Sequence, residues 1–174
     1  MQVYFVRHAE SLANKAGLDR TSETPLSENG LKQARIVAKR LANLKIDLVY
    51  SSTLVRAKQT AGVISKKIKT PIEDWDHLIE ANTHPEGFSD LNLRSKNILD
   101  HLLSHHRDQV VVCVSHATMI ETIIAKMIFG DHLSPQIIQD IRKHFGTTNT
   151  GISLCEFTEN DGWVLQSFND SSHL

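Results

Sequence analysis

The chain has 174 residues, of which 40% are hydrophobic and 22% are charged, a composition that excludes a disordered protein and suits one compact core. Its 19 lysines and arginines against 20 acidic residues give a net charge of −1, which excludes a globally basic nucleic-acid-binding protein. We therefore expect a single domain over residues 1–174.

Short apolar runs alternate with segments of helical periodicity along most of the chain. Val3 to Val6 form the first β-favouring run, and residues 9–27 after it are small and polar and predict mostly loop. Ser27 can cap a helix whose apolar residues follow at helical spacing. The remaining pattern predicts, in chain order, a helix over 28–41, a strand over 47–50, a helix over 54–69, a short strand over 71–75, a polar loop over 76–88, a helix over 90–106, a strand over 109–114, helices over 117–129 and 135–144, and strands over 151–157 and 163–168 joined by a hairpin turn.

The strand predicted at 109–114 contains the uninterrupted apolar run from Val110 to Val114. Such a run is typical of a strand that is buried on both faces in a mostly parallel sheet. Together with the alternation of strands and helices, it predicts a three-layer α/β sandwich, in which a mainly parallel central β-sheet carries helices on both faces.

Polar residues follow three of the predicted strands at the point where each strand ends. Arg7-His8 follow the first, Arg56 lies in the first helical turn after the second, and Ser115-His116 follow the fourth. Ligands of open α/β sheets bind outside the carboxyl ends of the strands, so we expect these side chains to converge on one crevice. Arginine forks and helix N-termini suit a phosphoryl group, which is therefore the predicted ligand.

A histidine in such a crevice can take part in the reaction as well as bind. A neutral imidazole can attack phosphorus and form a phosphohistidine, which divides phosphoryl transfer into two steps. Nearby guanidinium charge disfavours the imidazolium form and balances the negative charge of the transition state. A carboxylic acid is then needed to protonate the leaving oxygen. Because guanidinium groups supply the positive charge, this mechanism requires no metal ion or other cofactor.

Four blocks of sequence carry these polar residues, and each stands beside a predicted strand end or helix start. They are Arg7-His8-Ala9-Glu10-Ser11 with Asn14, Pro25-Leu26-Ser27 with Gly30 and Gln33-Ala34, the segment from Ser51 to Ala61, and the segment from Val112 to Ala117. The blocks resemble, in residues and in order, the signatures of the histidine phosphatase superfamily, also called phosphoglycerate mutase-like. The ending Asn169-Asp170 with His173-Leu174 is similar to that of short members.

The resemblance implies a role for seven positions. His8 would be the phosphorylated nucleophile, and Glu80 would stand where the family places its proton donor. Arg7, Arg56 and His116 would bind the phosphoryl group with help from Ser11 and Asn14. The match around Glu80 is looser than elsewhere, because the family's Gly-aromatic segment is missing after it, and Glu86 is a rival for the same role.

The same resemblance implies a phosphatase that hydrolyses phosphomonoesters of a small metabolite or of a phosphoprotein. A phosphoglycerate mutase-type phosphotransferase is the alternative with the same chemistry, and the short chain speaks against it because mutases generally carry insertions that enclose the substrate. A non-catalytic module that binds a phosphorylated partner is the alternative from another class. For the oligomeric state the sequence makes no prediction.

Other polar residues receive structural interpretations. We expect Glu10 to be structural, Ser52 and Ser115 to cap the helices after them, and the pair His101 and His105 to lie on a solvated helix face instead of binding zinc. The histidines expected at the surface are His84, His106, His132 and His144.

The two cysteines, the length of the apolar runs and the N-terminal sequence bear on the cellular location of the protein. Cys113 and Cys155 lie in apolar runs without a CxxC spacing and predict buried free thiols. No apolar run approaches the roughly 20 residues that span a bilayer, and the N-terminus lacks a signal-peptide pattern. We therefore expect a cytoplasmic protein that binds neither membrane nor nucleic acid.

Overall fold

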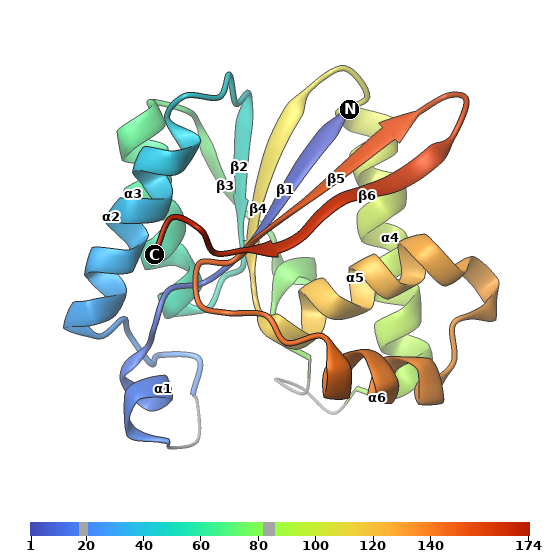
Figure 1. Cartoon of the computed structure of the whole chain (residues 1–174), viewed down its shortest axis with the longest axis horizontal. Coiled ribbons are helices and arrows are strands. Elements are labelled where there is room, and N and C mark those ends of the chain that lie inside the picture. Colours follow the sequence, from blue (N-terminus) through green and yellow to red (C-terminus); the bar gives the residue numbers. More distant parts are fainter. Residues whose placement is uncertain (18–20, 82–85) are drawn as a thin grey trace.

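The computed structural model describes residues 1–17, 21–81 and 86–174 and contains one six-stranded sheet in this part of the chain (Figure 1). The strands lie in the order β3-β2-β4-β1-β5-β6. Pairing is parallel between β3 and β2, β2 and β4, and β4 and β1, and antiparallel between β1 and β5 and between β5 and β6. The strand bounds are Gln2–Arg7 for β1, Leu48–Ser51 for β2, Ile72–Asp74 for β3, Val110–Ser115 for β4, Ile152–Thr158 for β5 and Gly162–Asp170 for β6.

Helices cover both faces of this sheet. Figure 1 shows α2 and α3 on one side of the strands and α4 and α5 on the other. The helices span Leu12–Ala16 (α1), Glu28–Leu41 (α2), Val55–Ile68 (α3), Phe88–His105 (α4), Ala117–Phe129 (α5) and Pro135–His144 (α6), with 3₁₀ turns at Asp76–Leu78 (η1) and Gly130–His132 (η2). This arrangement confirms the three-layer α/β sandwich with a mainly parallel sheet.

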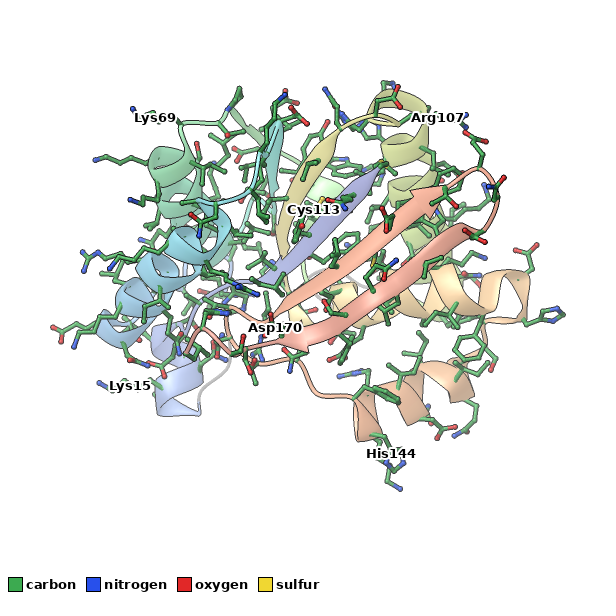
Figure 2. The ribbon with its side chains drawn as sticks, turned by 45° about the horizontal axis from the view of Figure 1, so that its top comes forward. Lys15, Lys69, Arg107, Cys113, His144 and Asp170 are labelled. Carbon is green, nitrogen blue, oxygen red and sulfur yellow. The ribbon has the colours of Figure 1, made fainter. Side chains whose placement is uncertain are left out.

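Strand β4 shows why an unbroken apolar run was needed at the centre. Val111 and Cys113 pack into the core beneath α4 and α5, whereas Val112 and Val114 pack into the core beneath α2 and α3. Successive side chains of a strand point to opposite faces, so a strand covered on both sides must be apolar at every position. Cys113 lies inside the molecule while the labelled lysines, Arg107 and His144 lie at its periphery (Figure 2).

The start of α2 is fixed against the loop that follows β1 by a close backbone approach. Ser27 accepts a hydrogen bond from the Gly30 amide and donates its own amide to the Glu10 carbonyl. A Cβ at Gly30 would lie 1.9 Å from that carbonyl oxygen, so only glycine fits. The Ser27 hydroxyl also donates to the Glu10 carboxylate at 2.5 Å, which confirms the structural interpretation of Glu10.

The loop predicted at 9–27 is wrong over part of its length, because α1 lies within it. This helix has only five residues, too few for apolar periodicity to reveal. Its signals are local: Ser11 and Asn14 form a capping box, and Gly17 ends the helix in the left-handed region with φ 64°.

The loop predicted at 76–88 is also interrupted. Turn η1 lies at its start and Phe88 at its end already belongs to α4. Residues 82–85, including His84, lie outside the described residues.

One histidine expected at the surface is buried. His106 is 9% exposed, and its ring nitrogens contact the Tyr50 hydroxyl at 2.9 Å and the Gln109 side chain at 2.5 Å. His101 lies beside it, with its ring 4.7 Å from that of Trp75. The surface prediction is therefore wrong for His106, which the aromatic residues of neighbouring elements enclose, and correct for His132 and His144.

The cysteines behave as expected, and both Cys113 and Cys155 are buried free thiols. Burial raises the pKa of the Cys155 thiol to about 12. Among the described residues, no helix combines the length and the apolar character that crossing a membrane requires.

Candidate active site

The structure brings His8 and Arg56 into direct contact at the carboxyl end of β1. His8 follows β1 and is fully buried, and Arg56 lies in the first turn of α3 with 2% of its surface exposed. The Arg56 Nε donates to His8 Nε2 at 3.2 Å, and Arg56 Nη1 donates to the carbonyl of Thr21 at 3.0 Å.

These contacts determine the protonation state of the His8 ring. His8 Nδ1 lies 2.7 Å from the carbonyl oxygen of Ala9, which can only accept, so Nδ1 carries the proton. A guanidinium can only donate, so Nε2 presents its lone pair to Arg56. The imidazole is therefore neutral, with Nε2 as the nitrogen that is directed at the positive charge.

A second buried histidine stands opposite. His116 directly follows β4, and its ring centre lies 5.0 Å from that of His8. Its Nε2 contacts the Ser52 hydroxyl at 2.8 Å, at the end of β2. The sheet thus brings the ends of three neighbouring strands together, as the sequence predicted.

Neither Ser52 nor Ser115 is the N-cap residue of the helix after it, contrary to the prediction. The N-cap of α3 is Leu54 and that of α5 is His116, and neither makes a side-chain capping bond. The Ser52 hydroxyl contacts His116 Nε2 and also accepts from the Leu54 backbone amide at 3.3 Å, and the Ser115 hydroxyl donates to the Leu78 carbonyl at 2.6 Å. These serines therefore position the histidine and the segment that precedes Glu80.

Arg7 occupies the last position of β1, where it pairs in register with Ser115 of β4. Its backbone is held by Thr150 and Gly151, with hydrogen bonds of 3.0 and 3.2 Å. Its side-chain Nη1 donates to the carbonyl of Thr147. The guanidinium is thus directed by the segment that connects α6 to β5.

The structure separates the two candidate acids. Glu86 forms a bidentate ion pair with Arg94, in which the two nitrogen–oxygen distances are 2.8 and 2.6 Å and both side chains are largely buried. Both carboxylate oxygens of Glu86 are therefore engaged by the Arg94 guanidinium. Glu80 is half-buried, and its Oε1 accepts from the Ala81 amide at 3.0 Å. The geometry therefore favours Glu80 over Glu86 as a proton donor.

Ser11 and Asn14 contact each other at the start of α1. The Ser11 hydroxyl donates to the Asn14 side-chain oxygen at 2.9 Å and accepts from the Asn14 amide at 3.1 Å. The contacts that the structure gives for the two side chains are those of a helix cap, and a part of theirs in ligand binding stays a prediction.

Three side chains that received no role from the sequence hold the backbone around His8. Thr60 accepts from the Ala9 amide at 3.0 Å, Gln33 accepts from the Glu10 amide at 2.9 Å, and Gln59 accepts from the Leu26 amide at 2.8 Å. All three belong to the blocks that carry the family resemblance, which was the available signal. They fix the loop that follows β1 against α2 and α3.

The segment between α6 and β5 supplies further contacts that the sequence did not reveal. Asn149 donates its side-chain amide to the His8 carbonyl at 2.9 Å, and Thr147 contacts Arg7 through its carbonyl. The Thr147 hydroxyl also donates to the Glu121 carboxylate at 3.1 Å. Burial raises the pKa of Glu121 to about 7.

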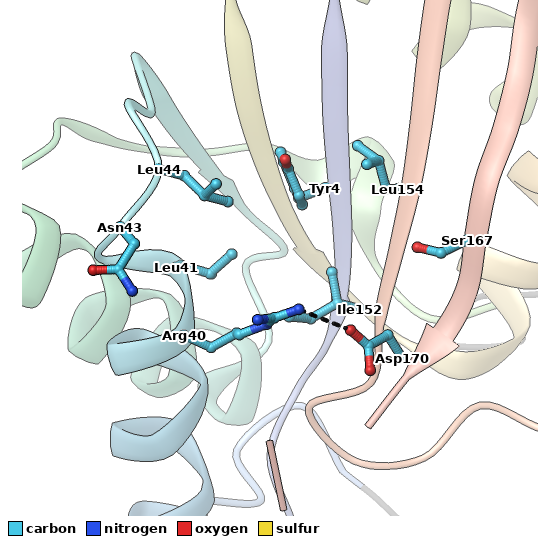
Figure 3. A pocket seen from close by; sticks show the side chains of 9 residues that line it. All are labelled: Tyr4, Arg40, Leu41, Asn43, Leu44, Ile152, Leu154, Ser167 and Asp170. Atoms are coloured by element: carbon cyan, nitrogen blue, oxygen red, sulfur yellow. Dashed lines mark hydrogen bonds and ion pairs between the residues drawn. The ribbon is translucent and has the colours of Figure 1, made fainter. Parts of the chain in front are cut away.

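Two hollows flank the segment that contacts Arg56. One of about 630 Å³ is bordered by Leu12 and Thr21, and one of about 480 Å³ by Ser22 and Arg94. A third hollow, of about 240 Å³, is lined by Tyr4, Arg40 and Asp170 among others (Figure 3), and none of the predicted site residues borders it. Arg40 is paired there with Asp170 at 3.3 Å. In the described ranges, no three His, Cys, Asp or Glu side chains gather as a metal site would require.

Known proteins resemble this chain over nearly its whole length. It is 27% identical over 211 aligned positions to "Probable phosphoglycerate mutase GpmB" of Yersinia pestis (strain Pestoides F), covering all of this chain and 95% of that protein. The phosphoserine phosphatase of Entamoeba histolytica, solved with 3-phosphoglyceric acid, superposes with a TM-score of 0.83 at 23% identity, covering 99% of this chain and 98% of that one. The alpha-ribazole phosphatase of Shigella flexneri superposes with a TM-score of 0.81 at 22% identity, covering 98% and 96%.

The two structures share the fold with this chain. The family follows from the sequence itself, since the model of the histidine phosphatase superfamily (branch 1) matches residues 3–85 and 81–171. This match confirms the resemblance that the four sequence blocks indicated. The chain belongs to the histidine phosphatase superfamily, branch 1.

Proposed function

We propose that this chain hydrolyses phosphate monoesters through a phosphohistidine on His8. The observation that carries the proposal is the neutral His8 ring, whose Nδ1 donates to the Ala9 carbonyl and whose Nε2 lone pair faces Arg56. A nucleophile of phosphorus needs such a lone pair, and the adjacent guanidinium attracts the phosphoryl oxygens to it.

In the first step, His8 Nε2 attacks phosphorus as the bond between phosphorus and the ester oxygen breaks. Glu80 in its acid form gives its proton to the departing alcohol oxygen. Arg7, Arg56 and His116 donate hydrogen bonds to the phosphoryl oxygens and stabilise the charge of the transition state. Ser11 and Asn14 assist at the edge of the site.

In the second step, water attacks the phosphohistidine. The Glu80 carboxylate takes a proton from this water, the bond between Nε2 and phosphorus breaks, and inorganic phosphate leaves. The ring then regains its lone pair and Glu80 its proton, so the enzyme returns to its first state.

We favour phosphorylated small molecules as substrates over phosphoproteins. Structural neighbours are named for phosphoserine and alpha-ribazole phosphate chemistry, and one was solved with 3-phosphoglyceric acid. We further propose that residues 1–174 act as one domain in the cytoplasm, where the buried free thiols Cys113 and Cys155 suit a reducing environment.

Mutase activity is the second candidate, because the relative at 27% identity carries a mutase name. That alignment has 211 positions against 174 residues in this chain, so the relative contains segments that this chain lacks. A shorter chain leaves the phosphohistidine more open to water, which favours hydrolysis.

A screen of phosphorylated metabolites and phosphopeptides in the presence of a metal chelator tests the proposal. We expect phosphate release from small phosphomonoesters and, after rapid alkaline quenching, an acid-labile phosphoenzyme on His8. Isomerisation of phosphoglycerates that outpaces phosphate release would favour the mutase. Binding of vanadate without any turnover would favour a non-catalytic module, and loss of all turnover in chelator would contradict the mechanism.

A further inference from the structure

Glu121 is a buried carboxylate that the proposed reaction does not use. It lies on α5, one turn beyond His116, and is 5% exposed. It borders an apolar pocket of about 170 Å³ whose other walls include Phe129, Phe145 and Phe168. Burying an ionised carboxylate in apolar surroundings costs free energy, so an ionised Glu121 needs contacts that compensate for it.

Charged groups on other elements of the fold act on the Glu121 carboxylate. Burial is the largest influence and raises its pKa, the hydrogen bond from Thr147 and the charge of Arg142 on α6 lower it, and smaller effects come from Glu80, which raises it, and Arg7, which lowers it. Strand β6 faces it with the apolar residues Leu165 and Phe168. Burial outweighs the groups that lower the pKa, so the pKa of the Glu121 carboxyl rises to about 7. The group therefore changes charge near neutral pH.

A continuous chain of contacts leads from Glu121 to Arg7. The Thr147 hydroxyl donates to Glu121 Oε1 at 3.1 Å, and the carbonyl of the same residue accepts from Arg7 Nη1. The segment around Thr147 is held at other points as well, since Thr148 donates its amide to the Asn169 side chain at 2.8 Å. Thr147 thus connects the carboxylate to the arginine through one residue.

We propose that Glu121 is a positioning residue, whose ionised carboxylate holds Thr147 so that the Thr147 carbonyl directs the Arg7 guanidinium into the phosphate site. The inference rests on the proposed role of Arg7 in binding the phosphoryl group. A hydrogen bond to an ionised carboxylate is about twice as strong as one to a neutral group. Protonation of Glu121 therefore loosens Thr147 and with it Arg7.

The expected consequence is a pH-dependent affinity for phosphate. Above pH 7 the carboxylate is ionised and Arg7 is held in place, and below pH 7 the restraint weakens. Because Arg7 binds the phosphoryl group in the substrate complex, the effect appears in KM and in the affinity for inorganic phosphate, and because Arg7 also stabilises the transition state, kcat falls as well. A merely structural role of Glu121 would not give such a pH dependence.

The test compares the wild type with Glu121→Gln, which keeps the shape and an accepting oxygen but cannot ionise. The KM for p-nitrophenyl phosphate is measured from pH 5.5 to 8.5, and the dissociation constant of inorganic phosphate is measured by calorimetry over the same range. Titration of the ligand cancels in the ratio of variant to wild type. We expect this ratio to rise from about 1 at pH 5.5 to about 5 at pH 8.5, with its midpoint near pH 7.

Two further variants test whether the pH dependence arises from the contact between Glu121 and Thr147. Thr147→Val removes the hydroxyl but keeps the carbonyl, so it is expected to raise KM by a similar factor at pH 8.5 and to add little to Glu121→Gln in the double variant. Glu159→Gln is the matched control, because Glu159 is an exposed carboxylate that pairs with Arg107. It is expected to leave the ratio at about 1 at every pH.

Thermal unfolding shows whether the Gln variant is intact. A raised carboxyl pKa means that the folded state loses stability as pH rises from about 4.5 to about 7, and Glu121→Gln lacks this loss. We therefore expect its Tm to exceed that of the wild type at pH 8. A ratio that stays flat in active, folded enzymes would overturn the inference and leave the proposed function intact. If the wild type releases no phosphate, the proposed function fails, and calorimetry with phosphate still decides the role of Glu121.

Discussion

His8 and His106 are both almost excluded from solvent, yet the ring of His8 has a positively charged neighbour and the ring of His106 has neutral ones. His8 contacts a guanidinium and a backbone carbonyl, which together leave its Nε2 lone pair facing a positive charge. His106 contacts the Tyr50 hydroxyl and the Gln109 amide group, which are neutral and occupy both ring nitrogens. Burial alone therefore does not identify a nucleophile. The arginine beside the ring does, because it attracts the anion that the ring must attack.

The most severe test of this comparison replaces each histidine in turn. His8→Ala is expected to lower kcat/KM for phosphate release by about a thousandfold or more, because the phosphohistidine can no longer form. His106→Ala is expected to keep kcat/KM within about twofold and to lower the free energy of unfolding by about 1–3 kcal/mol, because the buried Tyr50 and the half-buried Gln109 each lose a hydrogen bond. Steady-state kinetics and urea unfolding measure both. Equal loss of activity in the two folded variants would refute the comparison.

Arg56 should matter through its geometry as well as its charge. Arg56→Lys keeps the charge, but an ammonium cannot reach His8 and the Thr21 carbonyl at the same time from the fork that Arg56 uses. We expect kcat/KM to fall by about 100-fold and vanadate to bind less tightly. Arg107→Lys, at an exposed ion pair, is the control and should have no effect. Activity of Arg56→Lys within about threefold of the wild type would show that charge alone suffices.

The two candidate proton donors, Glu80 and Glu86, can be compared in the same way. Glu80→Gln is expected to lower kcat by about 100-fold with alkyl phosphates and far less with p-nitrophenyl phosphate, whose leaving group needs no proton. Glu86→Gln should show no dependence on the leaving group, and it should lose about 1–3 kcal/mol of stability because Arg94 loses its bidentate partner. Rates with a series of leaving groups separate the two. A leaving-group dependence in the Glu86 variant alone would show that Glu86 is the proton donor.

The smallest expected effect is the pH dependence of stability that arises from His101, one of the histidines around Tyr50. Burial, and then the neighbouring His105, His106 and His77, lower the pKa of His101 below its usual 6.5. The unfolded chain then binds the proton more readily, so stability falls as pH drops below about 6.5. We expect Tm to decrease from pH 7 to pH 5.5, and to decrease less in His101→Gln, whereas activity at pH 7 stays unchanged. Identical Tm profiles in the two proteins would contradict this assignment.

Much of this architecture followed from local patterns in the sequence. The helix at Ala117–Phe129 and the strand at Val110–Ser115 were predictable because apolar periodicity and an unbroken apolar run are properties of the segment itself. The convergence of His8, Arg56 and His116 was predictable because parallel strands end at the same edge of a sheet.

Other features depend on contacts between distant segments and had no local signal. His106 is buried because Tyr50, more than fifty residues earlier, lies above it. Thr147 and Asn149 reach the candidate site from a segment with neither helical nor strand periodicity. Ser52 after β2 and Ser115 at the end of β4 resembled helix caps in sequence, and only the pairing of β2 with β4 shows that Ser52 faces His116.

The direction of β5 determines which part of the chain can approach the reacting histidine. Because β5 runs antiparallel to β1, its first residue, Ile152, pairs with Val6 beside the end of β1. The segment that enters β5 therefore arrives at the carboxyl edge of the sheet. A parallel β5 would deliver that segment to the opposite edge, about 20 Å away for a six-residue strand. One reversed strand thus allows insertions or deletions between α6 and β5 to reshape the environment of Arg7 while the four parallel strands keep their register.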